Sequence, residues 1–172
     1  MIDLLDTQKY LITPHIKEGG TVVDFTMGNG HDTLWLSQMV GDTGKVYAFD
    51  IQQAALDSTA ARLAEHSRTN VTLIKDSHSN VKTYVKEPIC AGLFNLGYLP
   101  GGDRSITTMR ETTLPAIRAA IELLEAGGGL LIAVYPGHAE GDDEGKMICD
   151  YLATLPRYKI CATRVNILNS PT

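Results

Sequence analysis

Residues 21–33 of the chain read Thr-Val-Val-Asp-Phe-Thr-Met-Gly-Asn-Gly-His-Asp-Thr, and this stretch decides the fold. Two apolar β-branched valines followed by Asp24 are typical of a strand that is buried on both faces and ends in a carboxylate. Gly28 and Gly30 allow the backbone to turn sharply and to approach a ligand without a Cβ in the way. The apolar residues after Thr33 start a helix, whose first free N–H groups point back at the turn. The stretch therefore predicts a strand, a glycine turn and a helix that together bind a small molecule.

The rest of the chain repeats this alternation of strand and helix. The expected strands cover residues 21–24, 45–50, 71–74, 89–94, 130–135 and 158–165. The expected helices cover residues 32–39, 51–65, 114–125 and 143–155, and the glycines at 127–129 are expected to end the third of them. This rhythm predicts a mainly parallel, doubly wound α/β sheet with helices on both faces. We expect one domain over residues 1–172, with residues 1–17 as a helical segment that flanks the core.

The composition limits the class of partner and the compartment. With 44% hydrophobic residues and a net charge of −5, the chain can bury a core but does not resemble a general polyanion binder, which collects Lys and Arg. Cys90, Cys149 and Cys161 are far apart, so we expect neither disulfides nor a cysteine zinc site. The histidines show no metal-ligand spacing, and we expect no metal. Reduced thiols, a charged amino-terminal segment and the lack of an apolar run of about 20 residues predict a cytoplasmic protein without a membrane span.

The candidate functional residues lie in the loops that follow the strands. In parallel sheets of this kind, ligands bind beyond the carboxyl ends of the strands, close to the point where the strand order switches. The loops after the first five expected strands cover residues 26–32, 50–52, 76–80, 95–104 and 136–144. The unusual residues of the chain fall within these loops, so we expect the site there.

Two kinds of cofactor site use a glycine turn after the first strand and an acid after the second. A dinucleotide site needs Gly-x-Gly-x-x-Gly, but Thr33 stands where the third glycine should be, and Asp32 would repel a pyrophosphate. The other frame, acid-x-x-x-Gly-x-Gly, is satisfied by Asp24, Gly28 and Gly30. It resembles the cofactor motif of class I S-adenosylmethionine (SAM)-dependent methyltransferases, whose cofactor carries an ammonium and a sulfonium but no phosphate.

This resemblance implies a Rossmann-like methyltransferase fold with SAM as the cofactor. The glycine turn would approach the methionine part of SAM, Asp50 would accept the ribose hydroxyls, and residues 51–52 and 76–78 would border the adenine. The cofactor-binding residues that the resemblance implies are Asp24, Thr26, Gly28, Asn29, Gly30, Asp32, Thr33, Asp50, Ile51, Gln52, Ser77, His78 and Asn95. The residues alone leave an alternative open, in which Asp50 only ends its strand and caps the next helix.

A second motif, Asn95-Leu-Gly-Tyr98, follows the fourth expected strand. It resembles the Asn/Asp-Pro-Pro-Tyr motif of amino methyltransferases, with Leu-Gly in place of the two prolines, which makes the loop less rigid. Methyl transfer is an in-line displacement, so the enzyme must hold the lone pair of a neutral amine opposite the sulfonium. The Asn95 side-chain carbonyl and a neighbouring backbone C=O can each accept an amine N–H, and Tyr98 can stack on a flat base.

Over nearly its whole length the chain resembles one narrow group, the bacterial rRNA methylases, which include enzymes that methylate 5-aminomethyl-2-thiouridine at the tRNA wobble position. The resemblance rests on residues 26–33, 49–52, 94–103 and 135–138. It implies methyl transfer to the aminomethyl nitrogen of the wobble uridine, with the tRNA anticodon stem-loop as the partner. The implied catalytic residues are Asn95, Tyr98 and His138, and the implied substrate-binding residues are Tyr98, Gly101, Gly102, Arg104, Tyr135 and His138. The alternative for His138 is a loop histidine that bonds only to backbone.

Three points stay open. An rRNA or small-molecule methyltransferase on the same fold is the alternative function, and a non-catalytic nucleotide- or RNA-binding module is the alternative from another class. An RNA site in an acidic chain must be a small basic rim or be built by two subunits, so a homodimer is also open. Class I sheets end in a hairpin of strands six and seven, so here either the seventh strand is missing or the sheet edge is closed differently.

Overall fold

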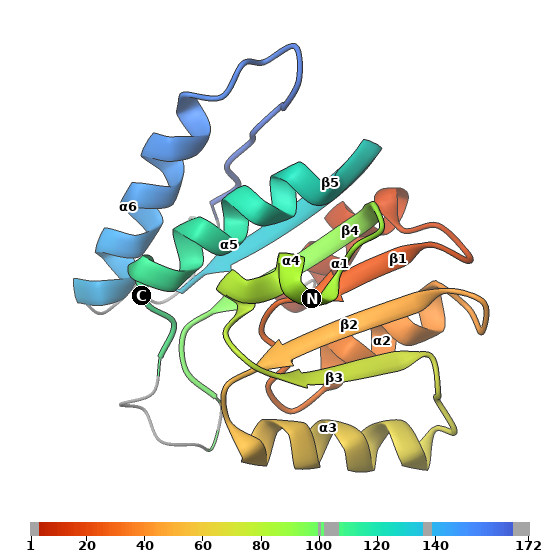
Figure 1. The fold of residues 1–172 in the computed structure, drawn as a ribbon. Coiled ribbons are helices and arrows are strands. Elements are labelled where there is room, and N and C mark those ends of the chain that lie inside the picture. Colours follow the sequence, from red (N-terminus) through yellow and green to blue (C-terminus); the bar gives the residue numbers. More distant parts are fainter. Residues whose placement is uncertain (1–3, 100, 102–106, 136–138, 167–172) are drawn as a thin grey trace.

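Five parallel strands form one sheet in the order β3-β2-β1-β4-β5 (Figure 1). The computed structural model describes residues 4–99, 101, 107–135 and 139–166. The strands are β1 (Thr21–Asp24), β2 (Lys45–Asp50), β3 (Val71–Lys75), β4 (Ile89–Leu96) and β5 (Leu124–Val134). The helices are α1 (Leu4–Ile12), α2 (His31–Met39), α3 (Gln53–Glu65), α4 (Val81–Tyr84), α5 (Arg110–Leu123) and α6 (Ala139–Ala153), with short 3-10 turns η1 (Thr13–His15) and η2 (His78–Asn80). The predicted parallel α/β sheet is confirmed.

Helices cover both faces of the sheet because successive strand residues point to opposite sides. On one face, α1 and α2 contribute Ile12 and Leu36 to a buried cluster that includes Val22 of β1. On the other face, α5 contributes Ile117 to a second buried cluster, which includes Val23 of the same strand. The two adjacent valines thus serve two cores, as expected for a strand that is buried on both faces.

The strand order switches at β1. β2 and β3 extend the sheet on one side of β1, whereas β4 and β5 extend it on the other. The last residue of β1 is Asp24, the last residue of β2 is Asp50, and Asn95 is the penultimate residue of β4. Because the strands are parallel, these three polar side chains lie at the same edge, where such sheets bind ligands.

The helix predicted over residues 114–125 starts earlier than expected, at Arg110. The Met109 carbonyl accepts the N–H groups of Thr112 and Thr113, and these bonds form the first turn of the helix. Because most residues of this turn are polar, the sequence shows no amphipathic pattern there. The helix ends at Leu123 rather than at the glycines.

The glycines at 127–129 lie inside β5 and do not end a helix, contrary to the prediction. Ile89 of β4 pairs with Leu124, but the next aligned pair joins Ala91 to Gly129. The surplus residues of β5 form a bulge, and Gly127 adopts a φ of +81° there. Glycine supplies a positive φ in a β-bulge as readily as it does at a helix end. The glycine run alone therefore did not distinguish a bulge from a helix end.

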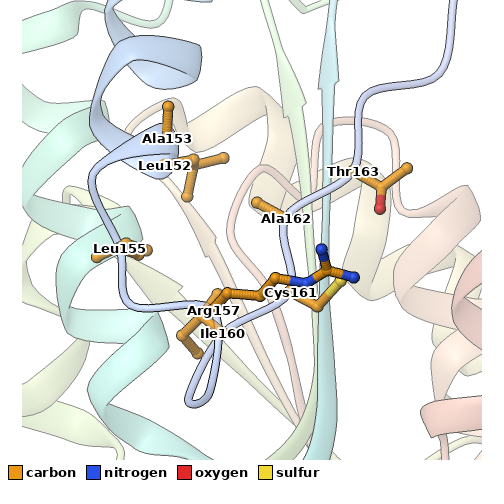
Figure 2. Close-up of a pocket in the computed structure, with 8 residues that line it drawn as sticks. All are labelled: Leu152, Ala153, Leu155, Arg157, Ile160, Cys161, Ala162 and Thr163. Carbon is orange, nitrogen blue, oxygen red and sulfur yellow. The ribbon is translucent and has the colours of Figure 1, made fainter.

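The strand predicted over residues 158–165 is wrong. Residues 160–166 have no regular secondary structure, and nearly all are exposed. Alternating apolar residues form a strand only where a neighbouring strand completes the hydrogen bonds, and β5 is the last strand among the described residues. The segment instead runs back past the end of α6 and leaves a hollow of about 310 Å³ beside Leu152, Ile160 and Cys161 (Figure 2).

The amino-terminal segment is helical, as predicted. α1 and η1 pack against β5, and the His15 Nδ1–H donates to the Gly127 carbonyl at 2.8 Å. Within the described part of the chain, neither α1 nor any other helix is long and apolar enough to cross a membrane.

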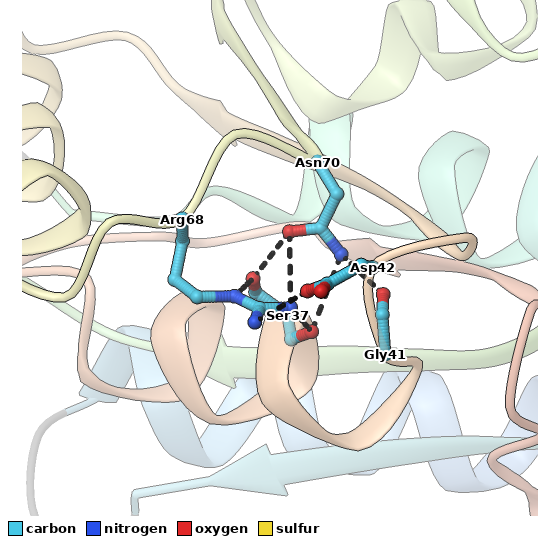
Figure 3. Close-up of polar contacts among 5 residues, drawn as sticks. All are labelled: Ser37, Gly41, Asp42, Arg68 and Asn70. Carbon is cyan, nitrogen blue, oxygen red and sulfur yellow. Dashed lines mark hydrogen bonds and ion pairs between the residues drawn. The ribbon is translucent and has the colours of Figure 1, made fainter.

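A network of polar contacts connects the end of α2 with the residues before β3 at the opposite, amino-terminal edge of the sheet (Figure 3). The Arg68 guanidinium donates to the Ser37 carbonyl at 2.6 Å and to the Asp42 carboxylate at 2.8 Å. The Asn70 amide donates to the carbonyls of Ser37 and Gly41 at 3.2 and 2.8 Å. These bonds satisfy carbonyls at the end of α2 that have no partner within the helix.

Candidate active site

Asp24 stabilises the glycine turn through hydrogen bonds to residues on both sides of it. Its carboxylate is fully buried and accepts the Thr26 N–H at 3.1 Å and the Thr33 hydroxyl at 2.6 Å. Burial raises the pKa of Asp24 to about 7, the hydrogen bonds from Thr33 and Thr26 oppose this rise, and the negative charges of Asp32 and Asp50 add to it. A cationic ligand beside this cluster of acids would therefore favour the ionised form of Asp24.

The turn itself is supported by α3. Gly28 and Gly30 both have positive φ, +49° and +77°. The Thr59 hydroxyl donates to the Gly28 carbonyl at 3.1 Å, and the Arg62 Nε–H donates to the Asn29 carbonyl at 2.8 Å. A Cβ on Gly30 would lie 2.9 Å from the Thr59 Cα, so this glycine is required by the close approach of α3 and not only by a ligand.

Asp50 joins the glycine turn to the end of β2. Its two carboxylate oxygens accept the Gly28 N–H at 3.1 Å and the Gln52 N–H at 3.0 Å. Burial raises the pKa of Asp50, and its backbone hydrogen bonds moderate the rise. Because the side chain is only partly buried, it keeps further lone pairs for a ligand. α3 begins at Gln53, and its N-cap residue is Gln52. Asp50 is therefore not the simple cap of this helix that the alternative interpretation describes.

Asn95 lies across the switch point from Asp50, at the end of β4. Its backbone N–H donates to the Thr26 hydroxyl at 2.8 Å, and its side-chain Nδ2 donates to Asp32 at 2.9 Å. Lys9 of α1 reaches the same Asp32 carboxylate at 3.7 Å. The bond to Asp32 orients the amide, which leaves the buried Asn95 Oδ1 without a hydrogen-bond donor among the described residues.

The loop after Asn95 follows a path that two prolines could not take. Gly97 has a φ of +140°, whereas proline is fixed near −65°. Tyr98, which is 41% exposed, forms an isolated bridge with Thr107. Tyr135 follows β5 and is also partly exposed, at 39%.

Some of the remaining predicted site residues lie within the described part of the structure, and others lie outside it. His78 is buried beneath the strand ends, where its Nδ1–H donates to the Phe25 carbonyl at 3.1 Å and its ring packs edge-on against Phe94. Burial lowers the pKa of His78, and the bond to Phe25 opposes this shift. Ile51 and Ser77 occupy the loops after β2 and β3, and Gly101 lies in a turn. Gly102, Arg104 and His138 lie outside the described residues.

Several side chains that hold the site were not singled out from the sequence as site residues: Lys9, Thr59, Arg62, Thr108 and Glu144. They come from α1, α3 and α6 or from the segment before α5, and no local motif marks them. Across the described ranges, no group of three or more His, Cys, Asp or Glu side chains is placed to hold a metal ion.

Comparisons with known proteins place this chain in a family. A family model described as "Putative rRNA methylase" matches residues 46–172. A chloroplastic tRNA (mnm5s2U34)-methyltransferase of Arabidopsis thaliana is 38% identical over 167 residues, which cover 91% of this chain and 61% of that protein. The chain thus spans about three fifths of the length of this relative.

Solved structures agree with the family match. A Clostridium thermocellum crystal structure with the same description has a TM-score of 0.94 and 40% identity, covering 100% of this chain and 92% of the other. A Streptococcus mutans methyltransferase in complex with S-adenosylhomocysteine (SAH) has a TM-score of 0.85 and 36% identity, covering 99% and 94%. The chain therefore belongs to the rRNA methylase family and has the class I methyltransferase fold.

The residues of the site fit SAM. Two carboxylates lie close to the glycine turn: Asp50 accepts the Gly28 N–H, and Asp32 accepts the Asn95 amide. This charge suits a cofactor with two positive charges and no phosphate. The oxygens of Asp50 retain acceptor capacity for a ribose, and the unpartnered Asn95 Oδ1 provides an acceptor at the neighbouring strand end. The same acids would disfavour a dinucleotide, as the sequence indicated.

Proposed function

We propose that the chain methylates the aminomethyl nitrogen of 5-aminomethyl-(2-thio)uridine at the tRNA wobble position. The observation that carries the proposal is the buried Asn95 Oδ1, an acceptor at the end of β4 that receives no hydrogen bond from a described residue. Among the common methyl acceptors, an amine has N–H groups to donate to such an oxygen, whereas an aromatic ring carbon has none.

SAM supplies the methyl group from its sulfonium, and this chain's residues hold the two reactants in line. In our proposal, residues 28–30 lie against the methionine part, Asp50 accepts the ribose hydroxyls, and Ile51, Gln52, Ser77 and His78 border the adenine. Asp24, Thr26 and Thr33 keep the turn in shape through the bonds described above.

Asn95 orients the substrate amine. Asp32 fixes the Asn95 amide through Nδ2, so its Oδ1 accepts one amine N–H in a defined direction. A neighbouring backbone carbonyl accepts the second N–H, which leaves the nitrogen lone pair directed at the methyl group. Positioning of this kind supplies much of the rate of a displacement reaction.

The exposed aromatic rings suit a flat base. Tyr98 and Tyr135 follow β4 and β5 at the same edge of the sheet, and each exposes about two fifths of its surface. We propose that they stack on the uridine, with Gly101, Gly102, Arg104 and His138 completing the substrate site. The partner would be the tRNA anticodon stem-loop, bound by one chain or by a homodimer. The three free thiols suit the cytoplasm.

The proposal is tested with tRNA from a strain that cannot methylate 5-aminomethyl-2-thiouridine. Purified protein and isotope-labelled SAM are incubated with this tRNA, and the nucleosides are identified by mass spectrometry. We expect label only in 5-methylaminomethyl-2-thiouridine, with Asn95→Ala inactive and Asn166→Ala, at an exposed position outside the sheet, fully active.

Other results would redirect the assignment. Label in rRNA from a parallel incubation, with none in the tRNA, would favour the alternative substrate that the family description names. SAH binding without transfer to any RNA would favour a non-catalytic module.

A further inference from the structure

The acceptor loop, residues 95–98, is tied to a buried carboxylate on a distant helix. The Gly97 N–H donates to the Thr108 hydroxyl oxygen at 2.9 Å, and the Thr108 N–H donates back to the Gly97 carbonyl at 3.0 Å. The Thr108 hydroxyl in turn donates to Oε2 of Glu144 at 3.1 Å. We call this arrangement of Gly97, Thr108 and Glu144 the loop clamp.

Glu144 lies in a buried environment that is energetically unfavourable for a carboxylate. It lies in the first half of α6, is only 5% exposed, and has no ion-pair partner within the described ranges. Its Oε1 is buried and receives no hydrogen bond from a described residue. Burial of a carboxylate that makes one hydrogen bond destabilises a fold, so packing alone does not account for a glutamate here.

The clamp fixes the peptide plane beside Asn95. The peptide unit between Leu96 and Gly97 is planar, so the direction of its N–H also sets the direction of the Leu96 carbonyl. By binding this N–H, Thr108 orients the backbone carbonyl that directly follows the Asn95 residue. A hydroxyl that donates to a carboxylate is also a better acceptor for the Gly97 N–H, because linked hydrogen bonds polarise one another.

We propose that Glu144, acting through Thr108, is a positioning residue that sets the acceptor loop for methyl transfer. The inference rests on the proposed function, in which Asn95 and an adjacent backbone carbonyl bind the substrate amine. The related Asn-Pro-Pro-Tyr motif gains its rigidity from proline rings. In this chain, a glycine with positive φ takes their place, and the clamp supplies the rigidity from outside the loop.

The test compares Thr108→Val, Thr108→Ser and Glu144→Gln with a matched control, Thr112→Val. Thr112 is a neighbouring threonine whose hydroxyl donates to the Met109 carbonyl of its own helical turn. We expect Thr108→Val to lower kcat on the tRNA about 10- to 100-fold, since the nucleophile is no longer held in line. Thr108→Ser keeps the hydroxyl and should restore most of kcat. Glu144→Gln should give an intermediate loss, because a neutral amide oxygen is a weaker acceptor.

Two further measurements separate positioning from stability. SAH affinity of Thr108→Val, measured by calorimetry, should match that of Thr112→Val. Melting curves should show a lower melting temperature for Thr108→Val, because Glu144 loses its hydrogen-bond donor, and kcat is compared at a temperature where both variants are folded. The double variant Thr108→Val/Glu144→Gln should have the kcat of Thr108→Val alone, because Glu144 acts only through Thr108. Additive losses, or a Thr108→Val enzyme with the kcat of the control, would overturn the proposal.

Hydrogen exchange of the Gly97 amide tests the clamp without any substrate. We expect slow exchange in the wild-type chain and in Thr112→Val, and fast exchange in Thr108→Val. Fast exchange in the wild-type chain would refute the clamp. If the wild-type chain transfers no methyl group but its Gly97 amide is protected, the proposed function fails while the clamp stands.

Discussion

At the scale of single residues, the proposed cofactor site depends most on Asp50. Each of its carboxylate oxygens accepts one backbone N–H, from Gly28 and from Gln52. An asparagine cannot reproduce this pattern, because one side of its amide is a donor and would face one of the two N–H groups.

Asp50→Asn should therefore weaken SAH binding by about 10- to 100-fold, the range for a lost hydrogen bond to a charged group. Isothermal titration calorimetry measures the change. The matched control is Asp57→Asn on α3, whose exposed carboxylate accepts only from Gln53. Equal SAH affinities for the two variants would show that Asp50 does not contact the cofactor.

Asp24 predicts a dependence of stability on pH. Its pKa rises to about 7 in the folded chain from an ordinary value of 3.8, so between these values the folded state binds the proton more tightly than the unfolded state. The contribution of Asp24 to stability is complete below pH 4 and is lost as the pH rises towards 7. The slope is of the order of 1 kcal/mol per pH unit in that window.

Urea unfolding of the wild-type chain and of Asp24→Asn at several pH values checks this slope. The asparagine variant does not titrate, so the free energy of unfolding of the wild type should fall relative to it between pH 4 and 7. A difference that stays constant across the window would mean that Asp24 titrates normally in the folded state.

At the scale of elements, the two edges of the sheet have separate tasks. The carboxyl edge carries Asp24, Asp50 and Asn95, whereas the amino edge carries the Arg68 and Asn70 network around the end of α2. Changes at the amino edge should reduce stability and leave ligand binding intact.

Asn70→Ala removes one of the donors to the carbonyls of Ser37 and Gly41, which keep those from Arg68 and Gly44, and should lower the free energy of unfolding by about 1–3 kcal/mol. Its SAH affinity at a temperature where the chain is folded should equal that of the wild type. A parallel loss of both quantities would mean that the two edges are coupled.

The same division explains what the sequence could predict. That Asp24, Gly28, Asp50 and Asn95 lie together could be predicted because parallel topology brings strand ends together whatever the helix angles are. Thr59 and Glu144 were not predicted as site residues, because their contacts depend on how α3 and α6 pack, and no local sequence pattern encodes this packing. The strand predicted over 158–165 was wrong for a related reason, since a strand needs a partner and the pattern shows only one side of the pair.

At the scale of the whole molecule, the acidic charge limits how RNA is held. With a net charge of −5, the chain can neutralise few phosphates, so under the proposed function an affinity for tRNA would come mainly from the base and the loop around it. A plot of log Kd against log salt concentration, measured by fluorescence anisotropy with the anticodon stem-loop, should have a slope of about 3 or less. A slope near that of basic RNA-binding proteins would reveal a cationic surface that the net charge conceals.

The docking of α1 against β5 has a consequence during synthesis. Lys9 pairs with Asp32 from a helix whose own support is β5, and His15 is separated from its partner Gly127 by 112 residues. At ribosomal speeds, these residues are made between roughly 6 and 20 s apart. α1 thus leaves the ribosome before the strand on which it docks, and a nascent chain completes the environment of Asp32 only after most of the sheet has been translated.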